Sequence, residues 1–458
     1  MVFSSGVFLF LFLPALLIVY YLVKNRSVRN YLLLLASLAF YAWGEPVFVF
    51  IMLASIFVNW FITLIMSGAS HKKFWLILAI SLDVLLLGVF KYAAFILENL
   101  AILAGHEIYT VNIALPIGIS FFTFQMMSYV FDVYYGKAQA QTNPLYTALY
   151  ISFFPQLIAG PIVRYNEIAD EITNRHENFD DFAEGTRRFI YGLGKKVLLA
   201  NFVGQIADNV FGYIINPSVL MSWLGALSYT LQIYFDFSGY SDMAIGLGLM
   251  FGFHFSENFN YPYIASSVSD FWHRWHISLS TWFRDYVYIP LGGSRVSKSR
   301  WLVNIFIVWL LTGIWHGANW TFILWGMIYF VLLIFERETG LKLGHFFTML
   351  AVILCWVIFR SESINSSINF IASMFGLNGN AFLDGGFMFC LKGSWSVILA
   401  ACLGAFPAAG KFLQSHKTPE ALFLCAVLTV SVFTPLKVEV YERVVARTYH
   451  LKHAHQKH

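Results

Sequence analysis

Apolar runs of about twenty residues recur along this 458-residue chain, and each run is long enough to cross the hydrocarbon core of a bilayer as a helix. Hydrophobic residues make up 59% of the chain and charged residues only 12%, about half the charged fraction of soluble proteins. The alternating segments of about ten residues that a membrane β-barrel needs are not seen. We therefore predict an all-α, polytopic integral membrane protein with about eleven or twelve transmembrane helices, plus re-entrant or interfacial helices.

The basic residues near the N-terminus indicate the orientation of the chain. Lys24, Arg26 and Arg29 follow the first apolar run, whereas a cleaved signal peptide has its positive charges first. We expect a retained first span, with the N-terminus in the periplasm and this basic loop in the cytoplasm. The mixed charges between Arg164 and Lys196 indicate a solvated cytoplasmic helix pair. The net charge of +4 gives no reason to expect nucleic acid binding.

Residues 1–435 are expected to form one transmembrane domain, and residues 436–458 a basic, histidine-containing tail. A solvated tail is favoured there, with metal binding as the alternative. The four cysteines lie in apolar segments without the spacing of a zinc or redox motif, so no metal site is predicted in the domain. They are Cys355, Cys390, Cys402 and Cys425.

Two histidines in apolar surroundings are the strongest candidates for a functional site, because a titratable side chain at membrane depth is costly and mostly faces protein or water. His316 lies about fourteen residues beyond the expected cytoplasmic end of its helix, roughly 20 Å into the membrane. Gly313 and Gly317 beside it would let two backbones approach or a substrate pass. The alternative is a buried histidine that only holds two helices together.

His276 belongs to an aromatic segment that is rich in arginine. If residues 271–285 form one helix, Trp272, Trp275 and Trp282 share a face, whereas His276 and Ser280 lie on another. Tryptophans and arginines are typical of the membrane interface, which places His276 near the cytoplasmic side. The two histidines are therefore expected to be separated across the membrane.

Two further polar groups interrupt the apolar pattern. Asp236 and Asp242, with Gln232, lie in an otherwise apolar span, so they should line a cavity or pair with arginines such as Arg274 or Arg284. The sequence Gly292-Gly293-Ser294-Arg295 is compatible with an anion-binding loop and equally with a simple turn.

Five motifs occur in an order that resembles the membrane-bound O-acyltransferase (MBOAT) family, in particular its bacterial alginate and peptidoglycan O-acetyltransferase branch. A transferase of teichoic acid D-alanylation is a more distant relative of this branch. The family's invariant histidine matches His316, and its second position, usually His or Asn, matches His276. The resemblance implies a funnel-shaped helical fold crossed by a central tunnel. The motifs are residues 234–246, 257–263, 271–286, 291–295 and 313–320.

The resemblance implies a multi-pass enzyme of the bacterial cytoplasmic (inner) membrane, embedded in the lipid bilayer. A cytoplasmic acyl thioester, either acetyl-CoA, another acyl-CoA or an acyl carrier protein, would serve as donor, with no permanently bound cofactor. His316 is the expected base, and His276, Asn319 or a tryptophan N–H the expected oxyanion donor. The phosphates of coenzyme A would bind to Arg284, Gly292, Gly293 and Arg295. The other expected substrate or tunnel residues are Trp275, Ser280, Trp282, Arg284, Trp315, Asn319, Trp320, Gln232, Asp236 and Asp242.

Neither a Gly-x-Ser-x-Gly elbow nor a hydrolase signature is present in the sequence. We therefore expect a separate periplasmic acetyltransferase partner of the SGNH type, which would modify the polysaccharide. The sequence leaves open whether the polymer is alginate or peptidoglycan. D-alanyl transfer from a carrier protein to teichoic acid remains an alternative, as does a non-enzymatic transporter or flippase of an acylated substrate.

Overall fold

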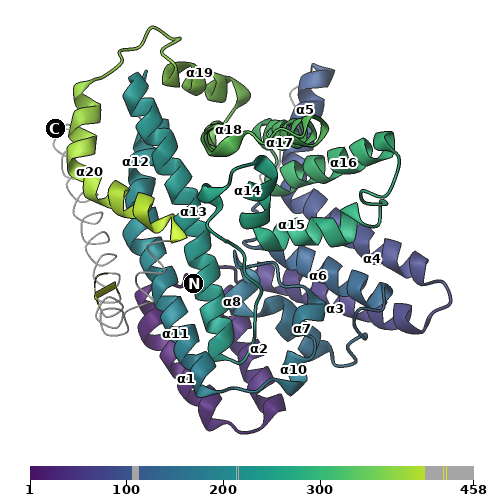
Figure 1. The fold of residues 1–458 in the computed structure, drawn as a ribbon. Coiled ribbons are helices and arrows are strands. Elements are labelled where there is room, and N and C mark those ends of the chain that lie inside the picture. Colours follow the sequence, from purple (N-terminus) through teal and green to yellow (C-terminus); the bar gives the residue numbers. More distant parts are fainter. Residues whose placement is uncertain (106–112, 213, 215, 408–425, 428–429, 431–458) are drawn as a thin grey trace, which may run out of the picture.

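The computed structural model describes residues 1–105, 113–212, 214, 216–407, 426–427 and 430. All regular structure in these residues is helical, which confirms the predicted all-α class (Figure 1). The tail at 436–458 lies outside the described residues, as does Cys425.

The N-terminal part is a series of helices joined by short loops. A π-helical turn, η2, joins α4 to α5, so residues 72–104 form one continuous helix. Residues 91–104 thus extend a helix that is long and apolar enough to cross a membrane. The elements are η1 (Phe8–Phe12), α1 (Leu13–Leu22), α2 (Arg26–Ala42), α3 (Phe48–Gly68), α4 (Lys72–Leu87), η2 (Gly88–Tyr92), α5 (Ala93–Ala104) and α6 (Ile119–Tyr134).

The middle part leads from short helices into one long helix, α13, which crosses the centre of Figure 1. A short helix, α8, follows α7, and all four of its residues are buried. The elements are α7 (Pro144–Ser152), α8 (Phe154–Leu157), α9 (Tyr165–Ile168), α10 (Glu171–Asn174), α11 (Phe179–Gly194), η3 (Lys195–Ala200), α12 (Asn201–Gly212) and α13 (Val219–Met250).

The C-terminal part begins with a 3-10 turn and two short helices, and continues in longer apolar ones. Two of these longer helices, α16 and α17, pack against each other. The elements are η4 (Pro262–Ile264), α14 (Val268–Arg274), α15 (Ile277–Phe283), η5 (Arg284–Tyr288), α16 (Lys298–His316), α17 (Trp320–Thr339), α18 (Gly344–Arg360), α19 (Ile364–Met374) and α20 (Gly385–Gly404).

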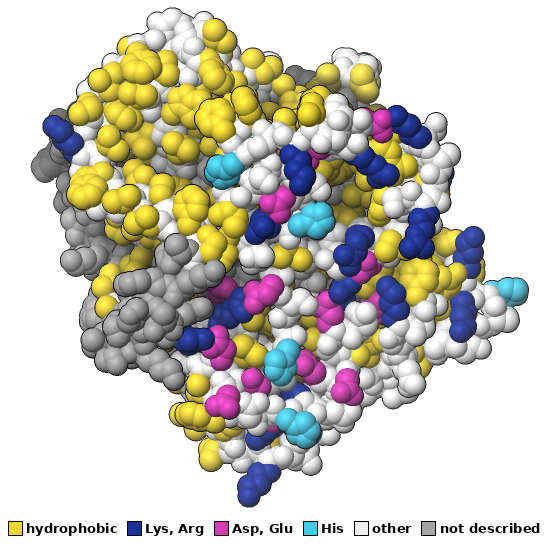
Figure 2. Space-filling view, viewed as in Figure 1, with side chains coloured by type: hydrophobic (Ala, Val, Ile, Leu, Met, Phe, Trp, Pro, Cys, Tyr) yellow, Lys and Arg dark blue, Asp and Glu magenta, His cyan; other side chains and the backbone are white. Residues whose placement is uncertain are grey.

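Within the described part of the chain, four helices are long and apolar enough to cross a membrane by themselves. They are residues 48–68, 72–104, 320–339 and 385–404. The larger number of spans stays a prediction. Figure 2 shows hydrophobic side chains over much of the upper left of the molecule, whereas charged side chains gather across the middle and the lower right.

Glycines bring α11 and α13 into direct backbone contact. A Cβ atom added to Gly192 of α11 would lie 2.5 Å from the carbonyl oxygen of Gly239 of α13. Gly185 and Gly246 form a second such pair one heptad away, again with 2.5 Å between the added Cβ and the carbonyl oxygen. This close packing buries one face of α11, whereas charged side chains on the rest of its surface, such as Asp180 and Glu184, stay exposed. The interpretation of residues 164–196 as a solvated cytoplasmic helix pair stays a prediction.

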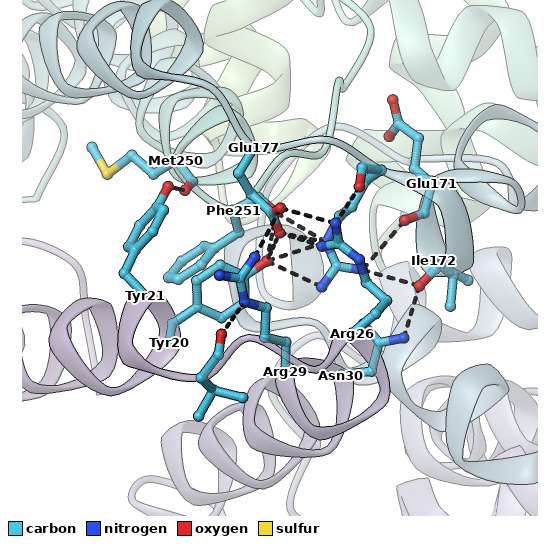
Figure 3. A network of polar contacts seen from close by, with 12 residues as sticks. Tyr20, Tyr21, Arg26, Arg29, Asn30, Glu171, Ile172, Glu177, Met250 and Phe251 are labelled. Atoms are coloured by element: carbon cyan, nitrogen blue, oxygen red, sulfur yellow. Dashed lines mark hydrogen bonds and ion pairs between the residues drawn. The ribbon is translucent and has the colours of Figure 1, made fainter.

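Three arginines surround one buried carboxylate and tie distant segments together (Figure 3). Glu177 pairs with Arg26 of α2 and lies 2.9 Å from Nη1 of Arg29. Arg175 is fully buried and donates a hydrogen bond of 3.0 Å to the carbonyl of Phe251, just after α13. The basic loop expected in the cytoplasm is therefore anchored against the segment before α11 and the end of α13.

Candidate active site

The backbone changes direction at His276, between α14 and α15. This residue has φ +45°, a left-handed conformation that is uncommon for a residue other than glycine. The interpretation of residues 271–285 as one helix is therefore wrong, because the helix breaks at the histidine. The break turns the His276 side chain into the protein, where it is 1% exposed.

Asn258 holds the His276 ring through a fully buried hydrogen-bond network. Its side-chain oxygen accepts from the backbone N–H of Ser278 at 3.2 Å and from the Ser278 hydroxyl at 2.9 Å. Its amide nitrogen donates to the hydroxyl of Ser241 of α13 at 3.0 Å. Because a backbone N–H can only donate, the atom facing Ser278 is the Asn258 oxygen.

The same oxygen lies 3.1 Å from Nδ1 of His276. Nδ1 must therefore carry a hydrogen and donate it, which leaves Nε2 of the neutral ring as an acceptor. Nε2 is buried and has no hydrogen-bond partner among the described residues. Neutral His276 thus presents an unpaired acceptor nitrogen.

A cavity of about 140 Å³ lies next to this network. Its lining includes Ile162, Arg164, Glu167, Glu257, Ser278 and Thr281. The charges at its wall are already paired: Nε of Arg164 lies 2.8 Å from Glu167, and Nη1 of Arg188 lies 2.5 Å from Glu257. The cavity therefore presents polar groups without an excess of positive charge.

His316 is the last residue of α16, and aromatic rings surround it. Its ring centroid lies 5.0 Å from that of Trp315, 5.0 Å from that of Trp325 of α17 and 5.1 Å from that of Phe359 of α18. Its side chain nevertheless stays partly accessible. Neither ring nitrogen has a hydrogen-bond partner in the part of the chain that the structure describes.

Trp315 contacts both histidines. Its ring centroid lies 5.9 Å from that of His276 and 5.0 Å from that of His316. The expected separation of the two histidines across the membrane is therefore wrong. It rested on counting residues along one helix, whereas α14 and α15 carry His276 to the end of α16.

Unpaired tryptophan N–H groups lie beside His316. The indole nitrogens of Trp315 and Trp325 are buried and have no acceptor among the described residues. A buried donor without an acceptor costs about 1–3 kcal/mol. A substrate oxygen bound here would satisfy one of these groups.

The two aspartates of α13 pair with cationic side chains. Asp242 lies 3.0 Å from Nη2 of Arg188 and 2.6 Å from Nζ of Lys195, and Asp236 pairs with Lys196. Asp242 thus pairs with an arginine, as expected, but this arginine is Arg188. Arg274 and Arg284, which were named as examples, have other partners. Arg274 binds Asp270 at 2.8 Å, and Arg284 binds Asp285 at 2.7 Å.

Several expected tunnel residues make structural contacts. Asn319 caps α17 by accepting from the Thr321 N–H at 3.0 Å, and its amide donates to the Glu362 carbonyl at 2.9 Å. The indole of Trp320 donates to Asn99 of α5 at 2.9 Å. The indole of Trp282 donates to the Phe124 carbonyl at 3.1 Å. These side chains hold α5, α6 and α17 in place around the histidines.

Three other expected residues lie inside the helical packing. Trp275 is 3% exposed and packs against Trp356 with ring centroids 4.9 Å apart. Gln232 of α13 packs against Gly204 of α12, and its side-chain oxygen is buried without a partner in the described chain. The hydroxyl of Ser280 makes only a long hydrogen bond of 3.5 Å to the Trp272 carbonyl.

Three of the residues expected to hold phosphates, Arg284, Gly292 and Arg295, are exposed, whereas Gly293 is buried. Gly292 and Gly293 have φ values of +107° and +58°, so they form a turn that glycine favours. The Gly293 carbonyl accepts from Asn304 at 3.1 Å. Arg295 is exposed, and the Arg284 side chain is 58% exposed. The turn is confirmed, and anion binding stays a prediction.

Asn258 and Lys91 are site residues for which the sequence analysis gave no role. Asn258 lies within a motif that carries the family resemblance, so its position was a usable signal. Lys91 was visible only as a charge in an apolar run, and its contact with the end of α16 depends on the fold. Among the described residues, no group of three His, Cys, Asp or Glu side chains is placed to hold a metal ion.

A helical membrane protein with two adjacent histidines enclosed by aromatic rings fits a class of intramembrane transferases, and comparison with known proteins identifies the family. The model of the membrane-bound O-acyltransferase family, MBOAT, matches residues 140–361. The chain belongs to the membrane-bound O-acyltransferase family and is an O-acyltransferase.

Curated relatives show the same relationship along most of the chain. A probable alginate O-acetylase AlgI of Pseudomonas aeruginosa is 46% identical over 396 residues, which are 82% of this chain and 75% of the relative. A peptidoglycan O-acetyltransferase of Helicobacter pylori is 37% identical over 424 residues, 83% of this chain and 80% of the relative. A teichoic acid D-alanyltransferase of Bacillus subtilis is 32% identical over 234 residues, 48% of this chain and 59% of the relative.

Proposed function

We propose that this chain transfers an acyl group, most simply acetyl, from a cytoplasmic thioester to a hydroxyl acceptor reached from the periplasm. The product would serve the O-acetylation of a cell-wall polymer or exopolysaccharide, either peptidoglycan or alginate. The observation that carries the proposal is the placement of two histidines on one tryptophan, Trp315, inside a helical membrane fold. The names of the relatives over four fifths of the chain support the acetyl group.

His316 is the proposed general base. It takes the proton of the acceptor hydroxyl, whose oxygen then forms a bond to the thioester carbonyl carbon. Collapse of the tetrahedral intermediate breaks the carbon–sulfur bond, and the proton passes from His316 to the departing thiolate. The partial accessibility of His316 and its free ring nitrogens suit direct contact with the substrate.

The unpaired indole N–H groups of Trp315 and Trp325 are the proposed oxyanion donors. His276 is less suited to that role, because Asn258 accepts the hydrogen on Nδ1 and leaves Nε2 as an acceptor. We therefore assign His276 the second catalytic position, where Nε2 accepts a hydrogen bond from the acceptor hydroxyl or relays its proton.

The cavity beside Ser278 and Thr281 is the proposed entry of the donor arm. Its charges are paired within the protein, which suits the neutral, amide-containing arm of an acyl thioester better than a phosphate. Phosphates of coenzyme A or of an acyl carrier protein would stay outside, near the exposed Arg284 and Arg295. The thioester is a substrate in this scheme, and no permanently bound cofactor is required.

The wider setting is part of the same proposal. Residues 1–435 would act as one transmembrane domain of the bacterial inner membrane, with the N-terminus in the periplasm. The chain would hand its acyl group to a periplasmic acetyltransferase of the SGNH type, which modifies the polymer. The relatives support this setting through their names as alginate and peptidoglycan O-acetylating proteins.

The proposal is tested with purified protein in lipid nanodiscs and radiolabelled acetyl-CoA. We expect His316→Ala to lower acyl transfer by about 100-fold or more while leaving the unfolding transition unchanged. His273→Ala is the matched control, because the His273 side chain is exposed and bonds only the carbonyl of its own helix at Ser269. Full activity of His316→Ala would refute the assignment.

The donor is identified in the same assay. Acetyl-CoA, an acetylated carrier protein and a D-alanyl carrier protein are offered separately, and the thiol released from each is measured. Release from acetyl donors supports O-acetylation. Release from the D-alanyl carrier alone would support teichoic acid D-alanylation instead. Uptake of the labelled substrate into proteoliposomes without thiol release would favour a transporter.

A further inference from the structure

The C-terminal end of α16 is held by two neighbouring residues from a different helix. Lys91 of η2 donates from Nζ to the carbonyl of Trp315 and, at 2.8 Å, to the hydroxyl of Ser120. The hydroxyl of Tyr92 donates to the carbonyl of Ile314 at 2.6 Å. The last carbonyls of a helix have no partner within it, so η2 supplies the partners that α16 lacks.

The charge of Lys91 is compensated by this helix end. In the described part of the chain no carboxylate pairs with Lys91, although it lies inside the membrane-spanning helix of residues 72–104. A cation there is expensive unless other groups compensate it. The C-terminus of α16 carries the negative end of the helix dipole, and the ring of Trp315 lies 5.7 Å from Nζ.

His316 is the residue that this arrangement affects most directly. It follows Trp315 and ends α16, so a shift of the Trp315 carbonyl moves its Cα and its ring. The contacts to His316 from α17 and α18 are aromatic, from Phe322, Trp325 and Phe359. The titratable side chains around the end of α16 are therefore Lys91, Tyr92 and His276.

We propose that Lys91 is a positioning residue for His316, which fixes the end of α16 and places a positive charge beside the catalytic imidazole. Tyr92 contributes to the position but not to the charge. A nearby cation disfavours a second positive charge on His316, so the ring is kept as the neutral base. This inference rests on the proposed function of His316.

Lys91→Met removes both the donor and the charge, and Lys91→Arg keeps both. We expect Lys91→Met to lower kcat by roughly tenfold to a hundredfold, as a displaced catalytic group does, with little change in the KM for the donor. The acidic limb of its pH–rate profile should move to higher pH, because His316 is protonated more easily without the cation. Lys91→Arg should restore most of kcat and the original profile.

Two further variants complete the experiment. Lys72→Met is the control, because Lys72 is exposed at the start of the same continuous helix. Tyr92→Phe removes only the bond to Ile314 and should lower kcat a few-fold without moving the pH profile. Tyr92→Phe also tests the proposal if Lys91→Met does not fold. A folded Tyr92→Phe with wild-type kcat would then overturn the proposal that η2 positions the end of α16.

The two proposals fail in different ways. Wild-type kcat and an unchanged pH profile in Lys91→Met, together with an inactive His316→Ala, would overturn the role of Lys91 and leave the transferase proposal standing. A fully active His316→Ala would overturn both proposals. A pH profile shifted equally in Lys91→Met and Lys91→Arg would also contradict the inference, because the two variants differ in charge.

Discussion

Removing the Asn258 side chain should destabilise the protein and release the His276 ring. In Asn258→Ala three donors lose their acceptor, namely the Ser278 N–H, the Ser278 hydroxyl and Nδ1 of His276. The Ser241 hydroxyl loses its donor as well. At roughly 1 kcal/mol for each buried hydrogen bond, the free energy of unfolding should fall by about 4 kcal/mol. We also expect acyl transfer to fall by at least about tenfold, because the ring is no longer oriented.

The measurement is denaturant-induced unfolding in detergent micelles, with acyl transfer measured on the same samples. Asn25→Ala is the control, since the exposed side chain of Asn25 accepts only one hydrogen bond, from the Val28 N–H at 3.2 Å, as the cap of α2. Its loss should cost about 1 kcal/mol. If Asn258→Ala is no less stable than Asn25→Ala, the network does not carry the stability that we assign to it.

Two further predictions concern the contact between α11 and α13 and the ion pairs of Glu177. Gly192→Ala should lower the free energy of unfolding by about 1–3 kcal/mol, because its Cβ would overlap the Gly239 carbonyl. Gly212→Ala is the control, since a Cβ there has open space and should not lower the stability. Equal stability of the two variants in micelles would contradict the packing argument. Burial opposes ionisation of Glu177, but hydrogen bonds from Arg26 and Tyr20 lower its pKa from 4.5 to about 2. Its contribution to stability is therefore fully present above pH 4.5 and is lost as the pH falls towards 2. Glu177→Gln should be less stable than wild type at pH 7 by about 3 kcal/mol, with a difference that shrinks at pH 3; a difference independent of pH would argue against the ion-pair account.

The all-α fold followed from the sequence because every buried backbone group in a bilayer needs a partner, and helices supply it locally. His316 could be recognised from the sequence for a similar reason. The free-energy cost of a titratable side chain at membrane depth does not depend on which residues surround it. The glycines at 313 and 317 were expected to allow close approach, and Gly313 does lie against the Phe322 carbonyl of α17.

The partners of charged and polar side chains could not be predicted. Asp242 pairs with cations about fifty residues earlier, and Lys91 reaches α16 from more than two hundred residues away. Such pairs depend on which helices are neighbours, and a single sequence carries no direct signal of that. The helix break at His276 was missed because its segment keeps a helical spacing of tryptophans, whereas the break itself is set by the Asn258 contacts.

The two glycine pairs between α11 and α13 leave this pair of helices only one workable register. A shift by one residue would place a side chain where a carbonyl oxygen now lies, and the four glycines of these pairs meet one another again only after seven residues, about 10.5 Å along the axis. The glycine pairs thereby block small sliding motions of α11 along α13. If the protein changes shape as the acyl group passes, α11 and α13 move together as one rigid body, and the hinges lie in other segments.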